Sequence, residues 1–278
     1  MEEGAKLSKS GQYINAIAKF EAALKLDPKN DAAQYQICLN YINAGNTKKA
    51  ITLLEYFINT YKVNLSQKYA FLGELYEQDK QVDKANECYR AGVKANPDYE
   101  RNYYNISLLY LAKYNDEEAE KWAIEALKRN NYDPNIYMLY MRIANMQAED
   151  EKGFYAACNF LLLEPNTERS VEVSAEMRKL MVDLHYAALS PENAEVQLKQ
   201  IFTEIYDDFK KVKPDPNDFF RNYYVDYFYN LSKSNQMPVF SRLMALANTP
   251  EQLTKWAGAN KTKTEAFYNW MRKTPRKF

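Results

Sequence analysis

The sequence predicts an all-α fold, in which about five helix pairs stack as a solenoid and a helical region follows them. A small residue recurs every 34 or 35 positions, at Ala16, Ala50, Ala85, Ala119 and Gly153. A period of this length is typical of stacked two-helix repeats. Strand signals are absent, and only 7 glycines in 278 residues argue against a sheet protein with many tight turns.

Larger residues keep step with the alanines and define the two helices of each repeat. A tyrosine precedes the alanine at Tyr41, Tyr76 and Tyr110, and a large residue follows it by one helical turn at Phe20, Leu54 and Tyr89. One small side chain per repeat lets the second helix approach the first closely, and the large residue fills the space beside it.

These residues resemble the tetratricopeptide repeat family. The first unit has Gly4, Leu7, Gly11, Tyr13, Ala16, Phe20, Ala23, Leu24 and Pro28. The second has Cys38, Tyr41, Gly45, Ala50, Leu54 and Phe57, and the third has Tyr69, Leu72, Gly73, Tyr76, Ala85, Tyr89 and Pro97. The fourth has Tyr103, Tyr110, Ala119 and Leu127, and a degenerate fifth runs from Tyr137 through Gly153 to Pro165. The resemblance covers residues 1–166 and implies a right-handed superhelical solenoid.

Residues 167–278 lose the repeat and are expected to form a helical region that caps or extends the solenoid. Helices are predicted near 168–188, 192–211, 217–234, 238–247, 250–259 and 263–273. Ser190 and Asp215, each followed by proline, are typical of helix starts. Thr249 and Thr262, each with Gln or Glu three residues later, predict capping boxes.

Two features of this region have alternative interpretations. Six rings fall within ten residues, at Phe219, Phe220, Tyr223, Tyr224, Tyr227 and Phe228. We expect Phe220, Tyr223, Tyr224 and Tyr227 to be buried, although the rings could instead form a contact surface for a protein or a sugar. The last seven residues include four basic ones, Arg272, Lys273, Arg276 and Lys277, which are expected to be a solvated terminus.

Composition disfavours several classes of partner. Lys plus Arg and Asp plus Glu both number 37, and the pI is near 6.7, so no charge bias indicates nucleic acid. No apolar run approaches the ~18 residues of a membrane span. Three cysteines lack metal-ligand spacing and predict free thiols.

Met1 would fall inside the first helix, so we expect that a leader was removed. The compartment stays open between the cytoplasm and the bacterial periplasm or envelope.

No motif for catalysis, a metal or a cofactor is present. His185 is the single histidine and falls within a predicted helix, and phosphate-loop, His-Glu-x-x-His and Gly-x-Ser-x-Gly motifs are absent. The sequence therefore predicts a non-enzymatic protein without a cofactor.

The family resemblance implies a concave face, lined by the first helix of each pair, that binds a peptide or partner protein. On this sequence the face comprises Tyr35, Leu39, Asn43, Ala70, Glu74, Glu77, Arg101, Tyr104, Asn105, Leu108, Met138, Arg142 and Asn145. Of the cluster with which some relatives capture a C-terminal carboxylate, only Asn105 is present. We therefore predict a protein-binding scaffold. The alternatives are a groove filled by the C-terminal helices, a self-associating structural subunit, a small-molecule or glycan binder using the six rings, and, last, a hydrolase.

Overall fold

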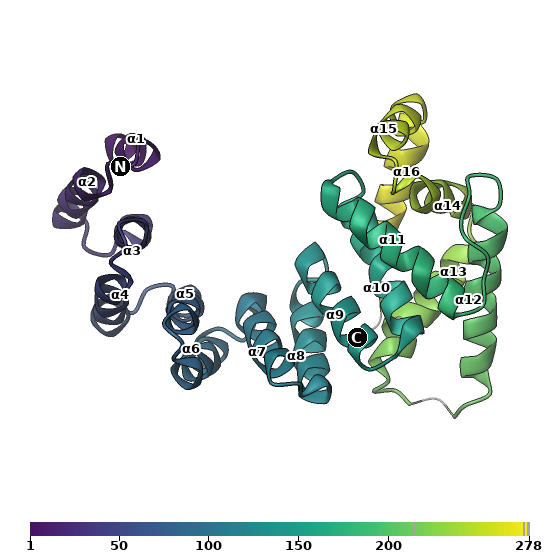
Figure 1. Ribbon diagram of the computed structural model, residues 1–278, viewed down its shortest axis with the longest axis horizontal. Coiled ribbons are helices and arrows are strands. Elements are labelled where there is room, and N and C mark those ends of the chain that lie inside the picture. The colour runs from purple at the N-terminus through teal and green to yellow at the C-terminus, as the bar shows by residue number, and fades with distance from the viewer. Residues whose placement is uncertain (214, 275, 277–278) are drawn as a thin grey trace. The chain divides into compact units, whose positions relative to one another are not determined.

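A computed structural model describes residues 1–213, 215–274 and 276. Within these ranges it contains helices and no strand, which confirms the predicted fold class. The chain divides into two compact units, Met1–Arg129 and Asn130–Phe278, which we call unit 1 and unit 2 (Figure 1). The sequence predicted a domain boundary near residue 166, where the repeat pattern ends. That boundary is defined by sequence and not by compactness, and it stays a prediction.

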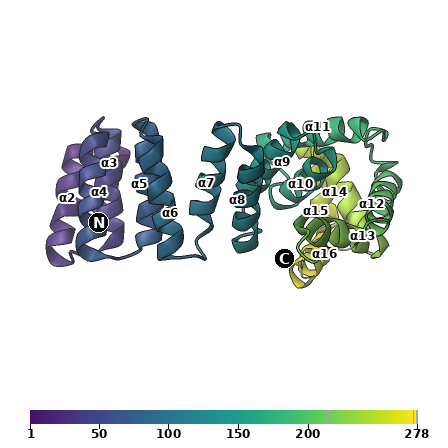
Figure 2. The same ribbon diagram turned by 90° about the horizontal axis from the view of Figure 1, so that it is seen from below.

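Unit 1 is a stack of four helix pairs. Each helix packs against the next one along the chain. In Figure 1 the first helices α1, α3 and α5 line one side of the stack and the second helices α2, α4 and α6 line the other, and Figure 2 shows their axes nearly parallel. The helices are α1 (Glu2–Lys9), α2 (Tyr13–Leu26), α3 (Asp31–Asn43), α4 (Thr47–Tyr61), α5 (Leu65–Gln78), α6 (Val82–Ala95), α7 (Glu100–Ala112) and α8 (Asp116–Arg129).

The recurring small residues lie where the helices of a pair meet. Ala16, Ala50, Ala85 and Ala119 lie on the second helix of successive pairs, and all four are completely buried. Large buried residues follow one turn later, at Phe20, Leu54 and Tyr89. The period read from the sequence is therefore a steric requirement of the helix–helix contact.

Ala85→Leu should lower the free energy of unfolding by about 2 kcal/mol, because added methylenes in a filled contact force the helices apart. Ala95, exposed at the end of the same helix, provides the matched control. Ala95→Leu should change stability by less than ~0.5 kcal/mol. Urea unfolding of both variants measures the difference, and equal effects would mean that the repeat phase is wrong.

Unit 2 is built around α10, whose residues from Gly153 to Leu162 are all buried. α9, α11 and α14 pack against it. The helices are α9 (Pro134–Met146), α10 (Asp150–Leu163), α11 (Glu168–Asp183), α12 (Ala194–Lys210), η1, a π-helical turn (Arg221–Val225), α13 (Asp226–Lys233), α14 (Met237–Leu246), α15 (Pro250–Ala259) and α16 (Lys261–Lys273).

The six rings predicted at 219–228 are all buried in unit 2, with exposed fractions of 0–9%. The ring of Phe228 lies 5.1 Å from that of Tyr155 and 5.0 Å from that of Phe202. The ring of Tyr224 stacks on that of Tyr140 at 5.8 Å. The rings therefore form part of the core of unit 2, as expected for Phe220, Tyr223, Tyr224 and Tyr227, and do not present a broad stacking surface to solvent.

Several local expectations for unit 2 were wrong. The helix predicted to reach residue 188 ends at Asp183, and His185 is exposed in the following turn with a φ of 65°. Neither predicted capping box forms, since the hydroxyl of Thr249 donates to the Leu246 carbonyl and Thr262 lies inside α16.

The basic end of the chain is only partly a solvated terminus. Arg272 and Lys273 are exposed, as expected. Arg276 instead places Nη1 in the interior of unit 2. Lys277 lies outside the described residues.

Candidate functional site

The predicted binding residues lie on the first helix of each pair, spaced so that those of one helix share a face. We call the part of this surface in unit 1 the first-helix face. It comprises Tyr35, Leu39 and Asn43 on α3, Glu74 on α5, and Arg101, Tyr104, Asn105 and Leu108 on α7. Met138, Arg142 and Asn145 lie on α9 in unit 2 and are described separately.

A charged cluster joins the third and fourth repeats on this face. Arg101 donates from Nε and Nη2 to Oε1 of Glu74, at 3.1 and 2.9 Å. The amide of Asn105 donates to the same oxygen at 3.3 Å, and the guanidinium lies 5.2 Å from the ring centre of Tyr104. Burial works against the charge of Arg101, but Glu74 raises the pKa of Arg101 overall. The structure therefore brings four predicted residues together.

The members of this cluster differ in how accessible they are to a ligand. The side chains of Arg101 and Glu74 are 42% and 33% exposed, so each could still contact a ligand. Asn105 is only 3% exposed. The amide of Asn105 therefore serves the contact between repeats rather than a surface for recognition.

An aromatic patch lies on the neighbouring repeats. Tyr35 is 47% exposed, and its ring centre lies 5.0 Å from that of Phe71 on α5. We expected Ala70 and Glu77 to line this part of the face. Ala70 is buried at 3% exposure, and Glu77 accepts a hydrogen bond from the hydroxyl of Tyr89 at 2.7 Å. The sequence did not predict Phe71 for this face and indicated the preceding residue, Ala70. The repeat pattern fixes the rotation of a helix about its axis only to within one residue.

The predicted residues of α9 in unit 2 are largely engaged by α11. Nη2 of Arg169 lies 2.9 Å from the sulfur of Met138, and the amide of Asn145 donates to Glu176 at 2.9 Å. Arg142 is exposed. In unit 2, therefore, α11 contacts the predicted surface at Met138 and Asn145, and both Arg142 and Asn145 stay exposed.

The acidic, histidine and cysteine side chains of the described residues are dispersed. Among them, no three His, Cys, Asp or Glu side chains lie close enough to hold a metal ion. Burial raises the pKa of the Cys38 and Cys88 thiols to about 12, so both are protonated at neutral pH. Within the described ranges, no helix has the length and apolar character needed to cross a bilayer.

Comparisons with known proteins agree with this architecture. Residues 7–55 and 69–99 match two family models, both described as tetratricopeptide repeat. A solved tetratricopeptide repeat protein from Parabacteroides merdae has a TM-score of 0.50 at 14% identity, with 95% of this chain and 96% of that chain covered. At this identity the likeness concerns the fold alone.

Two curated relatives share only a segment with this chain. The E3 SUMO-protein ligase RanBP2 of Homo sapiens is 34% identical over 107 residues, which are 37% of this chain and 3% of that protein. The DnaJ homolog subfamily C member 3 of Mus musculus is 25% identical over 202 residues, which are 72% of this chain and 34% of that protein. The chain therefore spans about a third or less of these relatives.

Proposed function

We propose that this chain, which belongs to the tetratricopeptide-repeat family, is a non-enzymatic scaffold that binds a peptide segment of a partner protein on its first-helix face. The observation that carries the proposal is the combination of exposed aromatic and charged side chains on successive first helices. Tyr35 is about half exposed, and the pair Glu74–Arg101 is partly accessible beside Tyr104.

Each part of this surface suits a peptide. Tyrosine provides a large contact area and loses little conformational entropy when it is fixed. The Glu74 carboxylate and Arg101 guanidinium offer an acceptor and several donors to a peptide backbone or to charged side chains. Because they also contact each other across repeats, they are already held in place before a ligand arrives, which reduces the entropy lost on binding.

The preferred ligand is an internal segment rather than a chain terminus. The basic cluster that captures a C-terminal carboxylate in some relatives is missing, and its one matching residue, Asn105, is buried against Glu74. The face instead combines one acid and one base with aromatic rings. The competing idea of a glycan stacked on the six rings of unit 2 loses support, because those rings are buried.

A selection of peptides from a random displayed library on the whole chain tests the proposal. Selected peptides should bind the double variant Tyr35→Ala, Tyr104→Ala at least ~10-fold more weakly than the native chain, a difference of ~1.4 kcal/mol. Tyr56 on the second helix α4 is 52% exposed and provides the matched control. Tyr56→Ala should leave the affinity unchanged. Peptides that bind all three chains equally would place recognition elsewhere.

A further inference from the structure

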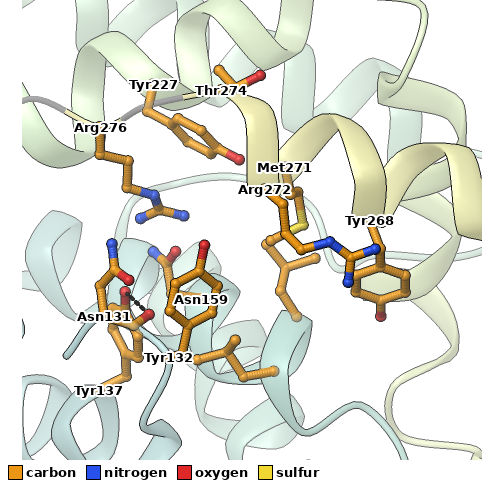
Figure 3. A pocket seen from close by; sticks show the side chains of 12 residues that line it. Asn131, Tyr132, Tyr137, Asn159, Tyr227, Tyr268, Met271, Arg272, Thr274 and Arg276 are labelled. Atoms are coloured by element: carbon orange, nitrogen blue, oxygen red, sulfur yellow. Dashed lines mark hydrogen bonds between the residues drawn. The ribbon is translucent and has the colours of Figure 1, made fainter.

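A cavity in unit 2 contains a buried cationic group with an unused hydrogen-bond donor. The cavity has a volume of about 340 Å³, close to the lower end of the range for small-ligand sites. Nη1 of Arg276 is buried there and has no hydrogen-bond partner among the described residues. Figure 3 shows the guanidinium of Arg276 directed toward Asn131 and Asn159. Arg276 also lines the cavity, so a ligand that enters it would lie beside this guanidinium.

The guanidinium of Arg276 packs against aromatic rings, and no carboxylate is among the described residues that line the cavity. Its central carbon lies 4.1 Å from the ring centre of Tyr227 and 4.8 Å from that of Tyr223. The ring of Tyr223 is fixed in turn, since its hydroxyl lies 2.5 Å from that of Tyr137, which also donates to the Asn131 carbonyl at 3.0 Å. Cation–π contacts stabilise the charge but leave the in-plane N–H groups available.

The described residues that line the cavity differ in charge from a neutral site. Two of them are arginines and none is an aspartate or glutamate. Arg272, the second arginine, is exposed and donates to Asn269 at 2.6 Å. A buried cation without a negative partner is destabilising, and an anionic ligand would remove that penalty.

We propose that this cavity binds a monocarboxylate that carries an apolar body. A planar guanidinium matches a carboxylate through two parallel hydrogen bonds. One buried cation balances one negative charge, which favours a carboxylate over a doubly charged phosphate. Leu162, Leu163, Met271 and Tyr268 line the same cavity and supply the apolar wall for the ligand's body. The carboxylate belongs either to a small free acid or to the C-terminus of a short peptide.

Calorimetric titration of the whole chain with 3-phenylpropanoate tests this inference. The acid should bind at least ~10-fold more tightly than its neutral isostere 3-phenylpropanamide, because only the acid can pair with Arg276. A peptide ending in a free leucine carboxylate, compared with its amidated form, shows whether a chain terminus is also accepted. The proposal is overturned if neither carboxylate binds, if the neutral forms bind equally, or if inorganic phosphate binds more tightly.

Two substitutions locate the site. Arg276→Gln should weaken binding of 3-phenylpropanoate at least ~10-fold. Arg276→Lys should retain part of the affinity, because the lysine ammonium keeps the positive charge but lacks the planar pair of donors. Lys273→Gln, at an exposed basic residue of α16 that is not among the residues lining the cavity, should change the affinity less than ~3-fold. Equal losses in the Lys273 and Arg276 variants would contradict a specific role for Arg276. The acid–amide comparison on the native chain decides the question even if the Arg276 variants unfold.

Discussion

Replacing Gly73 with alanine should lower the free energy of unfolding of unit 1 by about 3 kcal/mol, since the contact has no room for a methyl group. A Cβ atom at this position would lie 2.3 Å from Cε1 and 2.7 Å from Cδ1 of Tyr89. The ring of Tyr89 cannot move aside, because it is completely buried and its hydroxyl is fixed to Glu77 at 2.7 Å. Urea unfolding followed by circular dichroism measures the loss.

A double-mutant cycle separates this clash from other effects of the alanine. Tyr89→Leu removes the ring and is itself destabilising, because it leaves a cavity. In that background Gly73→Ala should cause little further loss, and the better helix propensity of alanine could even add ~0.5–1 kcal/mol of stability. An undiminished loss in the Tyr89→Leu background would show that the ring is not the cause.

The repeats could be predicted because one steric requirement recurs. Each pair needs a small residue where its helices touch, as at Ala16 and Ala85, and the resulting period is visible without knowledge of any contact. The same regularity predicted which residues would share the first-helix face. It did not predict which of them bond to one another, because the bond from Arg101 to Glu74 depends on rotamers and on the fit between two repeats.

Unit 2 was harder to predict because its contacts have no period. Burial was expected for Phe220, Tyr223, Tyr224 and Tyr227, and all six rings at 219–228 are buried, since a helix with rings on most sides must pack on most sides. The Arg276 cavity could not be foreseen. A basic residue near the end of a chain is usually solvated, and nothing in the local sequence shows that Tyr223 and Tyr227 lie against its guanidinium.

The second large effect is expected at a buried lysine that no repeat pattern indicates. The side chain of Lys68 on α5 is 6% exposed, and its ammonium is paired with Asp31 of α3 and donates to the Val63 carbonyl at 2.6 Å. The amide of Asn64 donates to the other oxygen of Asp31 at 2.9 Å. Asp31→Ala should therefore lower the free energy of unfolding by about 3 kcal/mol, because it leaves a buried charge without its partner.

Substitution of the other partner of this ion pair, Lys68, should lower the free energy of unfolding much less. The difference between the two losses is the test. Lys68→Met keeps the length and apolar stem of the lysine and removes its charge, while Asp31, whose side chain is 37% exposed, can be hydrated. The expected loss is less than ~1 kcal/mol, and adding Asp31→Ala to Lys68→Met should have little further effect. Asp31→Ala also removes an acid from the first turn of a helix, where it interacts favourably with the helix dipole. Asp83→Ala, at an exposed first-turn acid of α6, is the control for this contribution, which should be ~0.5 kcal/mol. If urea unfolding shows equal losses for Asp31→Ala and Lys68→Met, the buried charge is not what Asp31 stabilises.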